Sequence, residues 1–173
     1  GAGSEVFAMR AGEPLMERFK HFHLRPGTAA DGPAIETLVH TVLREYGLKP
    51  DPNGVDADLR DVEGMYGAQG GDFVLVEDET GLVGSAGLLP IDGTTAELRK
   101  MYLAKSVRGQ GLGRYLMERT ITLAKARGFR RLELETASEL TEAIALYQGR
   151  GFQPLCGGVH TCRCDLAFFL ELS

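Results

Sequence analysis

The glycine-rich stretch RGQGLGRYLM, residues 108–117, contains the residue types needed to bind a phosphate group. Its glycines lack a Cβ, so the backbone there can approach a ligand closely. These glycines are Gly109, Gly111 and Gly113. Apolar residues at helical spacing follow, and a helix N-terminus offers unpaired N–H groups and the positive end of the helix dipole. Arg108 and Arg114 flank the turn and can add charge-assisted hydrogen bonds to a phosphate.

One side chain elsewhere, Glu97, is a candidate for proton transfer. Glu97 lies in a run predicted to be a central strand, where a carboxylate is costly unless it is paired or functional. Arg99 lies two residues further on, and therefore on the same face of that strand. The residues alone leave open whether Glu97 is a base or one half of a structural ion pair. Tyr147 lies on an apolar helical face with Leu140 and Ile144, where core packing would also account for a tyrosine.

Two other phosphate-binding motifs fit the glycine-rich stretch less well. A P-loop requires Gly-Lys-Ser/Thr, which does not follow here. A dinucleotide-binding turn needs Gly or Ala where Arg114 stands, although Glu133 and Glu135 follow at about the spacing of a ribose-binding acid. The strand before the turn carries Glu97 and Arg99, whereas the buried parallel strand of a dinucleotide fold is nearly all apolar. A dinucleotide-dependent oxidoreductase is therefore the weaker alternative.

The elements that must position these residues follow from apolar periodicity and turn residues. Strands are predicted at 21–26, 72–78, 81–90, 94–103, 130–137, 152–155 and 165–172, and helices near 31–47, 59–66, 111–126 and 140–148. This order predicts a mixed α/β fold: a mostly antiparallel central sheet flanked by about four helices. The strand–helix–strand over residues 96–136 requires one parallel crossover, right-handed by default.

Length and composition limit the function classes. The chain has 173 residues, 43% of them hydrophobic and 25% charged, which fits one soluble globular domain. A net charge of −5 argues against nucleic acid as a partner. No apolar run approaches the ~20 residues of a membrane span and no signal peptide is visible, so we expect no membrane partner and a cytoplasmic location. Residues 1–20 are predicted to be a flexible or artificial segment, which leaves 21–173 as the domain.

His160, Cys162 and Cys164 could suggest a metal site. However, His-x-Cys-x-Cys is not a standard zinc spacing and no fourth ligand is apparent, so we expect no metal. Alternation would place the three side chains on one face of a strand or strand entry, where small thiols pack well. An odd count of three cysteines indicates reduced thiols in a cytosolic protein.

Residues 96–152 resemble the acetyl-CoA-binding core of the GNAT-superfamily N-acetyltransferases. The family's Gln/Arg-x-x-Gly-x-Gly/Ala pyrophosphate loop is matched by Arg108, Gly111 and Gly113. Its Ala-x-x-Leu-Tyr-x-x-x-Gly-Phe ending is matched by Ala143, Leu146, Tyr147, Gly151 and Phe152. The order of elements also agrees over about residues 22–172. One departure is Leu140, because many members have Asn there to hydrogen-bond CoA.

The resemblance implies a GNAT fold and an enzyme that moves the acetyl group of acetyl-CoA directly to an amine of a small molecule or peptide in a ternary complex. The donor-binding residues it implies are Met101, Tyr102, Leu103, Arg108, Gly109, Gln110, Gly111, Leu112, Gly113 and Arg114. It further implies that the strand ending at residues 101–103 bulges and splays from its parallel neighbour, and that a backbone N–H near Leu103 polarises the acetyl carbonyl. Glu97 would be the base, and Tyr147 would protonate the departing CoA thiolate. A non-catalytic acyl-CoA sensor of the same fold is the alternative.

The acceptor side is less well marked. By the same resemblance, the second helical region and its loops shape the acceptor pocket. The polar candidates there are Tyr46, Asp56, Asp58 and Tyr66, each expected to be a surface or capping residue more than a ligand contact. Exposed strand edges are compatible with a homodimer.

Overall fold

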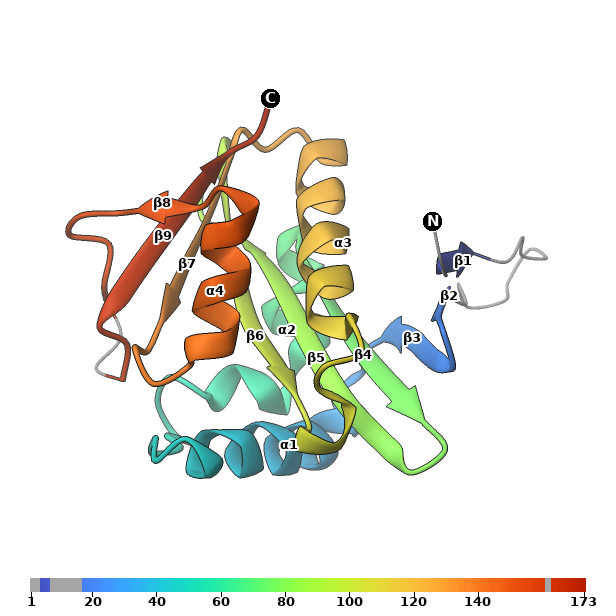
Figure 1. The fold of residues 1–173 in the computed structure, drawn as a ribbon. Helices are drawn as coiled ribbons and strands as arrows, with labels where there is room; N and C mark the ends of the chain where they lie inside the picture. Colours follow the sequence, from blue (N-terminus) through green and yellow to red (C-terminus); the bar gives the residue numbers. More distant parts are fainter. Residues whose placement is uncertain (1–3, 7–16, 161–162) are drawn as a thin grey trace.

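The computed structural model describes residues 4–6, 17–160 and 163–173, and its strands form one twisted sheet with helices on both faces (Figure 1). The strands are β1 (Ser4–Val6), β2 (Glu17–Phe19), β3 (Phe22–Pro26), β4 (Asp72–Asp78), β5 (Gly81–Pro90), β6 (Thr95–Leu103), β7 (Arg131–Thr136), β8 (Gln153–Pro154) and β9 (Leu166–Glu171). The helices of four or more α-helical residues are α1 (Gly32–Glu45), α2 (Val62–Met65), α3 (Leu112–Ala126) and α4 (Thr141–Arg150).

The strand order is β1-β2-β3-β4-β5-β6-β7-β9-β8, and only the pair β6–β7 is parallel among the described strands. Helix α3 supplies the crossover between those two strands. The predicted mixed α/β fold, with a mostly antiparallel sheet and one parallel crossover, is therefore confirmed. None of the described helices is long and apolar enough to cross a membrane.

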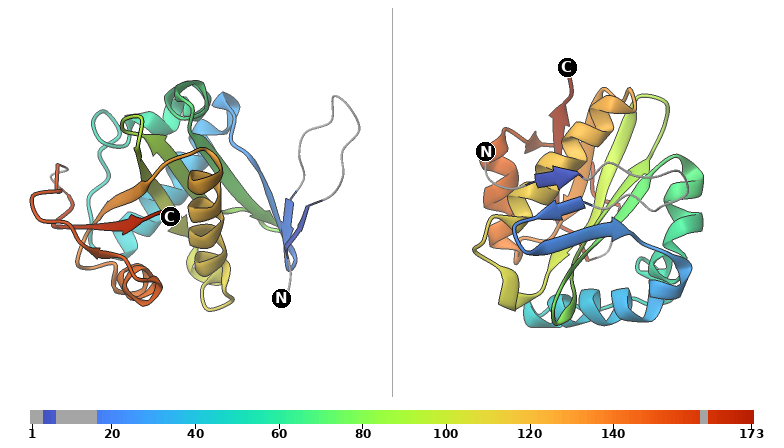
Figure 2. Two further views of the ribbon diagram at one scale, coloured as in Figure 1. Left: turned by 90° about the horizontal axis from the view of Figure 1, so that it is seen from above. Right: turned by 90° about the vertical axis from the view of Figure 1, so that its right-hand side faces the viewer.

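Each face of the sheet buries its own apolar cluster. Helices α3 and α4 cover one face, whereas α1 and α2 cover the other (Figure 2). On the first face, Leu116 of α3 packs in a cluster that includes Ala96 and Leu98 of β6. On the second, Ile35 of α1 packs in a cluster that includes Phe73 of β4. The period-2 alternation of the strands thus assigns each side chain to one face or the other.

Strand β6 is irregular where it leaves its neighbours. Gly87 of β5 pairs with Arg99, but Ser85 pairs with Tyr102, so β6 carries an extra residue at this point. Lys100, in this bulge, has a φ of 53°, which non-glycine residues rarely adopt. Strands β6 and β7 pair only over residues 95–97 and 131–133 and then diverge. The bulge and the splay expected near the end of this strand are both present.

The N-terminal segment departs from the prediction. Glu17–Phe19 forms β2, paired with β3, so the prediction of a flexible or artificial segment through residue 20 is wrong for these residues. The ring of Phe19 stacks on Tyr115 of α3 with centroids 4.5 Å apart, and Glu17 accepts hydrogen bonds from Tyr115 and Arg119. This strand is too short and too polar to show a periodic apolar signal in the sequence. Its contacts with α3, about 100 residues later, hold it in place.

One further local prediction needs correction. The second helical region is not one helix but the short α2 between 3₁₀ turns at Ala57–Arg60 and Gly67–Gln69. Of the two placements considered for His160 and Cys164, a strand or a strand entry, the structure shows the second, because both lie in the loop that leads into β9. Cys162 lies outside the described residues.

Candidate active site

A cavity of about 380 Å³ opens beside the end of β6. Its lining comes from α1, the end of β6, the glycine-rich loop, and the start of α4 with the residue before it. Eight of the ten predicted donor-binding residues line it: Met101, Tyr102, Leu103, Arg108, Gly109, Gly111, Gly113 and Arg114. The other two do not: Leu112 is buried in the core, and Gln110, whose carbonyl accepts a hydrogen bond from Lys20, lies beside the lining residues Gly109 and Gly111. We call this the donor cavity.

The glycine-rich loop has a backbone that its glycines make possible. Gly109 and Gly111 have φ values of 77° and 86°, in the left-handed region where a Cβ is strained. Helix α3 begins at Leu112, directly after Gly111. Its first N–H groups and its positive dipole end therefore lie at the cavity that Gly111 and Gly113 line. The predicted geometry, a glycine loop with left-handed residues directly before the start of a helix, is present.

The two arginines of the loop differ in what they contact. Arg108 donates to the Leu103 carbonyl at 2.9 Å and forms an ion pair with Glu45, and its guanidinium lies over the Tyr46 ring. This arginine therefore ties the loop to the end of α1. Arg114 lines the donor cavity and is exposed. Tyr46, expected on the acceptor side, lines the donor cavity as well.

Glu97 lies where β6 and β7 are still paired, directly opposite Glu133. Its Oε1 is 3.4 Å from Arg99 Nε, so the ion pair considered from the sequence exists. Burial raises the pKa of the Glu97 carboxyl; Arg99 opposes the rise, and the carboxylates of Glu135 and Glu133 add to it. A carboxylate whose pKa is raised in this way is a better proton acceptor than an exposed one, which keeps the base role open.

Tyr147 is 5% exposed and packs on Phe152, with ring centroids 5.5 Å apart. Burial raises the pKa of its phenol, and the nearby Tyr102 raises it further. Tyr147 does not line the donor cavity. Tyr102 does, and so do Ala143 and Leu146, which lie in α4 with Tyr147. The structure therefore shows the core packing of Tyr147 that the sequence allowed, and the role of Tyr147 as an acid stays a prediction.

A cluster of buried charges lies next to the bulge of β6. Lys100 Nζ is 3.1 Å from Asp56 Oδ1 and 3.2 Å from Asp58 Oδ1, and it donates to the Val55 carbonyl at 2.8 Å. Arg163 forms two hydrogen bonds of 2.7 and 2.8 Å to Asp56. Two carboxylates thus face two cations. We call these four charged residues the ion cluster.

The ion cluster corrects the expectation for three acceptor-side candidates. Asp56, Asp58 and Tyr66 are not surface residues, because each is at most 5% exposed. The Tyr66 hydroxyl donates to Asp58. Although burial alone would raise the pKa of Asp56, the hydrogen bonds from Arg163 and from the Asp51 N–H lower it well below its usual value. Alternation from Ala96 and Leu98 makes residue 100 the next inward-facing position of β6, and the sequence has a lysine there. A charge at an inward-facing position was the signal in the sequence that could have indicated a buried ion cluster.

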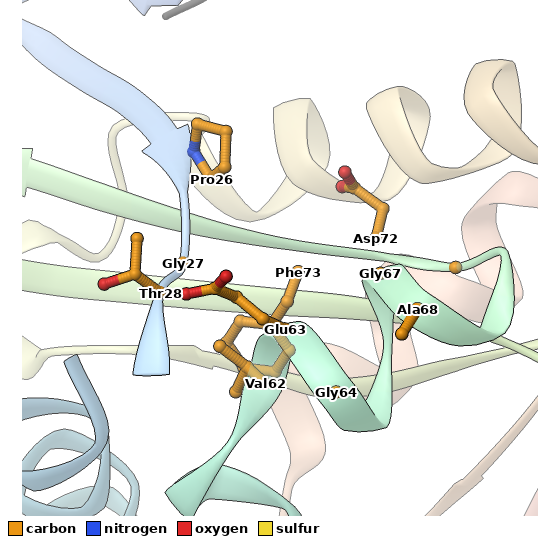
Figure 3. Close-up of a pocket in the computed structure, with 11 residues that line it drawn as sticks. Pro26, Gly27, Thr28, Val62, Glu63, Gly64, Gly67, Ala68, Asp72 and Phe73 are labelled. Atoms are coloured by element: carbon orange, nitrogen blue, oxygen red, sulfur yellow. The ribbon is translucent and has the colours of Figure 1, made fainter. Parts of the chain in front are cut away.

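Of the hollows outside the donor cavity, two are described. One of about 660 Å³ is formed by the loop after α1 and the loop before β9, and its lining includes Lys49, Asp51, His160 and Arg163. The other, of about 530 Å³, lies between α2 and the start of β4, with Glu63, Val62 and Phe73 at its wall (Figure 3). Arg163 lines the first of these hollows and also belongs to the ion cluster. Neither shares a lining residue with the donor cavity.

Comparison with known proteins places this geometry in a family. The model of the "Acetyltransferase (GNAT) family" matches residues 38–152, which is more than half of the chain. The chain belongs to the GNAT acetyltransferase family. Among curated relatives of this GNAT protein, the Escherichia coli "Uncharacterized N-acetyltransferase YjgM" is 38% identical over 157 residues, covering 86% of this chain and 94% of the relative.

Solved structures show the same fold. A GNAT-family acetyltransferase from Staphylococcus aureus Mu50 superposes with a TM-score of 0.82 at 21% identity, covering 88% of this chain and 99% of its own. A putative acetyltransferase from Salmonella typhimurium, solved with acetyl-CoA, has a TM-score of 0.64 at 24% identity, covering 88% of this chain and 94% of its own. At these identities the likeness concerns the fold.

Proposed function

We propose that this GNAT protein binds acetyl-CoA in the donor cavity and transfers its acetyl group to an amine of a small molecule or peptide. The observation that carries the proposal is that one cavity joins a left-handed glycine loop at a helix start to the bulged, splayed end of β6. The Salmonella structure, which was solved with its cofactor acetyl-CoA, supports this choice of donor.

The donor cavity offers each part of acetyl-CoA a suitable surface. The N–H groups at the start of α3 would receive the pyrophosphate, and the exposed Arg114 would add a positive charge. Beyond residue 97, β6 no longer pairs with β7, so its backbone polar groups on that side are open to an extended amide chain such as the pantetheine arm. The lining from Met101 to Leu103 belongs to this stretch.

The chemistry needs one proton acceptor and one donor. Glu97 would accept, through water, the proton that the amine loses as its nitrogen bonds to the acetyl carbon. The carbon–sulfur bond then breaks, and Tyr147 would donate its phenolic proton to the thiolate. The phenol of Tyr147 is protonated at neutral pH and so has a proton to give, although burial raises its pKa and makes it a weaker acid than an exposed phenol. A backbone N–H near Leu103 would hydrogen-bond the carbonyl oxygen as charge develops there.

The hollow of about 660 Å³ is our candidate for the acceptor site. It is lined by the loop after α1 and by Arg163, which belongs to the ion cluster beside the bulge of β6. An acceptor there would approach β6 from the side opposite α3. A cytoplasmic location and a homodimer remain predictions from the sequence.

A matched pair of glycine variants tests donor binding. Gly111→Glu adds a negative charge to the loop, whereas Gly128→Glu imposes the same left-handed strain, at φ 86°, outside the donor cavity. Coenzyme A should raise the melting temperature of the wild type and of Gly128→Glu but not of Gly111→Glu. No shift of the wild type at saturating acetyl-CoA and CoA would refute the donor assignment.

A second assay separates the enzyme from the non-catalytic sensor. Thiol release from acetyl-CoA is followed over a panel of amines and peptides. The enzyme should release thiol faster with at least one acceptor, and Glu97→Gln should abolish that stimulation. Tight CoA binding without any acceptor-dependent release would favour the sensor.

A further inference from the structure

We propose that Lys20, at the tip of the β2–β3 hairpin, is a phosphate-binding residue of the donor site. Its ligand would be a phosphate group at the nucleotide end of the donor, either the pyrophosphate or the 3′-phosphate. This inference rests on the proposed function, because it requires a phosphate-bearing donor at the glycine-rich loop. The hairpin lies within a part of the chain where the sequence indicated no functional element.

The hairpin holds Lys20 in a defined place. Phe19 pairs with Phe22, so Lys20 and His21 form a two-residue turn, and Lys20 has a φ of 53°. The stack of Phe19 on Tyr115 attaches the hairpin to the first turns of α3. Glu17 adds a bond to Arg119, with Nε and Oε1 2.9 Å apart. A left-handed backbone is strained at a lysine, and these contacts offset that strain.

The ammonium group of Lys20 reaches the loop itself. Its Nζ donates to the Gln110 carbonyl at 2.5 Å, across 90 residues of sequence. A Cβ built on Gly111 would lie 4.0 Å from the same Nζ, so the cation is next to the left-handed residue at the start of α3. An ammonium has three N–H donors, and this contact uses one. The side chain is exposed, which leaves the other two open to a ligand.

The charge balance of the loop favours a role for this cation. Arg108 is paired with Glu45, so its charge is largely neutralised before a ligand arrives. Glu142 lines the donor cavity and adds negative charge. Among the described residues that line the donor cavity, Arg114 is then the one cation left to face a ligand that carries several negative charges. Lys20 does not line the cavity itself but adds a cation at the adjoining Gln110 and Gly111 of the loop, and an ammonium is a suitable point charge for phosphate.

Isothermal titration of the full chain with CoA, dephospho-CoA and pantetheine tests the proposal. Lys20→Asn removes the charge and keeps a residue that tolerates the left-handed turn, whereas Lys20→Arg keeps the charge. Lys125→Asn removes an equally exposed lysine from the far end of α3 as the control. We expect Lys20→Asn to weaken CoA binding about 5- to 20-fold, less at high salt, while Lys20→Arg stays within about twofold of the wild type.

The three ligands separate the outcomes. A defect that persists with dephospho-CoA assigns Lys20 to the pyrophosphate, and a defect seen only with CoA assigns it to the 3′-phosphate. Wild-type CoA affinity in Lys20→Asn, or an equal loss for CoA and pantetheine, would overturn the inference. Failure of the wild type to bind CoA would instead overturn the proposed function on which the inference rests.

Discussion

Replacing Lys100 by Met tests whether the ion cluster holds the bulge of β6 in place. Methionine keeps most of the aliphatic stem but removes the ammonium group. The Lys100 side chain is buried, with 4% of it exposed. Asp56 would retain its two bonds from Arg163. Asp58 would retain only the Tyr66 hydroxyl and lose its nearest cation, 3.2 Å away. The variant therefore leaves one net negative charge buried.

The magnitude follows from the distances. At an effective dielectric of about 20, each ion pair at 3.1–3.2 Å represents roughly 5 kcal/mol of gross Coulomb attraction. Desolvation offsets much of this, and breaking a buried pair by removing one partner costs about 3–5 kcal/mol net. For a domain of this size we expect the melting temperature to fall by about 6–20 °C. Adding Asp58→Asn to Lys100→Met removes the unpaired charge and should recover part of the loss.

Urea unfolding followed by circular dichroism at pH 7 measures these changes in the free energy of unfolding. Lys125→Met is the control, because Lys125 is exposed on α3 and its loss should change stability by less than about 0.5 kcal/mol. A loss below about 1 kcal/mol for Lys100→Met, or a double variant less stable than the single one, would contradict the reasoning. In that case the cluster would not hold the bulge.

The remaining predictions concern two carboxylates. Glu97→Gln should lower the acetylation rate at least about 100-fold without changing CoA affinity. Because burial raises the pKa of Glu97, the wild-type rate should climb with pH through a value above the usual 4.5, and a variant that keeps this climb would exclude Glu97 as the base. The hydrogen bonds from Arg25 hold the pKa of Asp31 at about 2, below its usual 3.8. Its stabilising effect should be complete above about pH 4, be lost as the pH falls through about 2, and be nearly absent at pH 1. Asp31→Asn should therefore cost about 1 kcal/mol at pH 7 and close to nothing at pH 1 in urea unfolding; an equal loss at both would refute the pairing.

Much of the fold could be predicted because its signals are local. Strands β4 and β5 end at turn residues and were placed residue for residue, and the helix after the glycine-rich loop begins within one residue of its expected position. The donor cavity was predictable for the same reason, since most of its lining comes from the continuous stretch around β6 and α3. Short-range patterns therefore predicted both the framework and most of the residues that line this cavity.

The missed features depend on contacts between distant parts of the chain. Asp56 and Asp58 look like loop residues, and only folding brings Lys100 and Arg163 to them from 44 and 107 positions away. Strand β2 escaped notice because its stability comes from α3, about 100 residues later. A polar segment that gains its partners only in the folded state has no periodic pattern to reveal it.

The bulge at Lys100 connects the two halves of the proposed site. Its carbonyl accepts the Ser85 hydroxyl at 2.7 Å, while its ammonium reaches Asp56 and Asp58 on the opposite side of the chain. The residues that follow it line the donor cavity, and Arg163, bound to the same Asp56, lines the candidate acceptor hollow. A rearrangement of either the loop at Asp56 or the loop at Arg163 would therefore strain the strand that faces the donor. We infer that the ion cluster keeps donor and acceptor surfaces in a constant relative position, which direct transfer between two bound substrates requires.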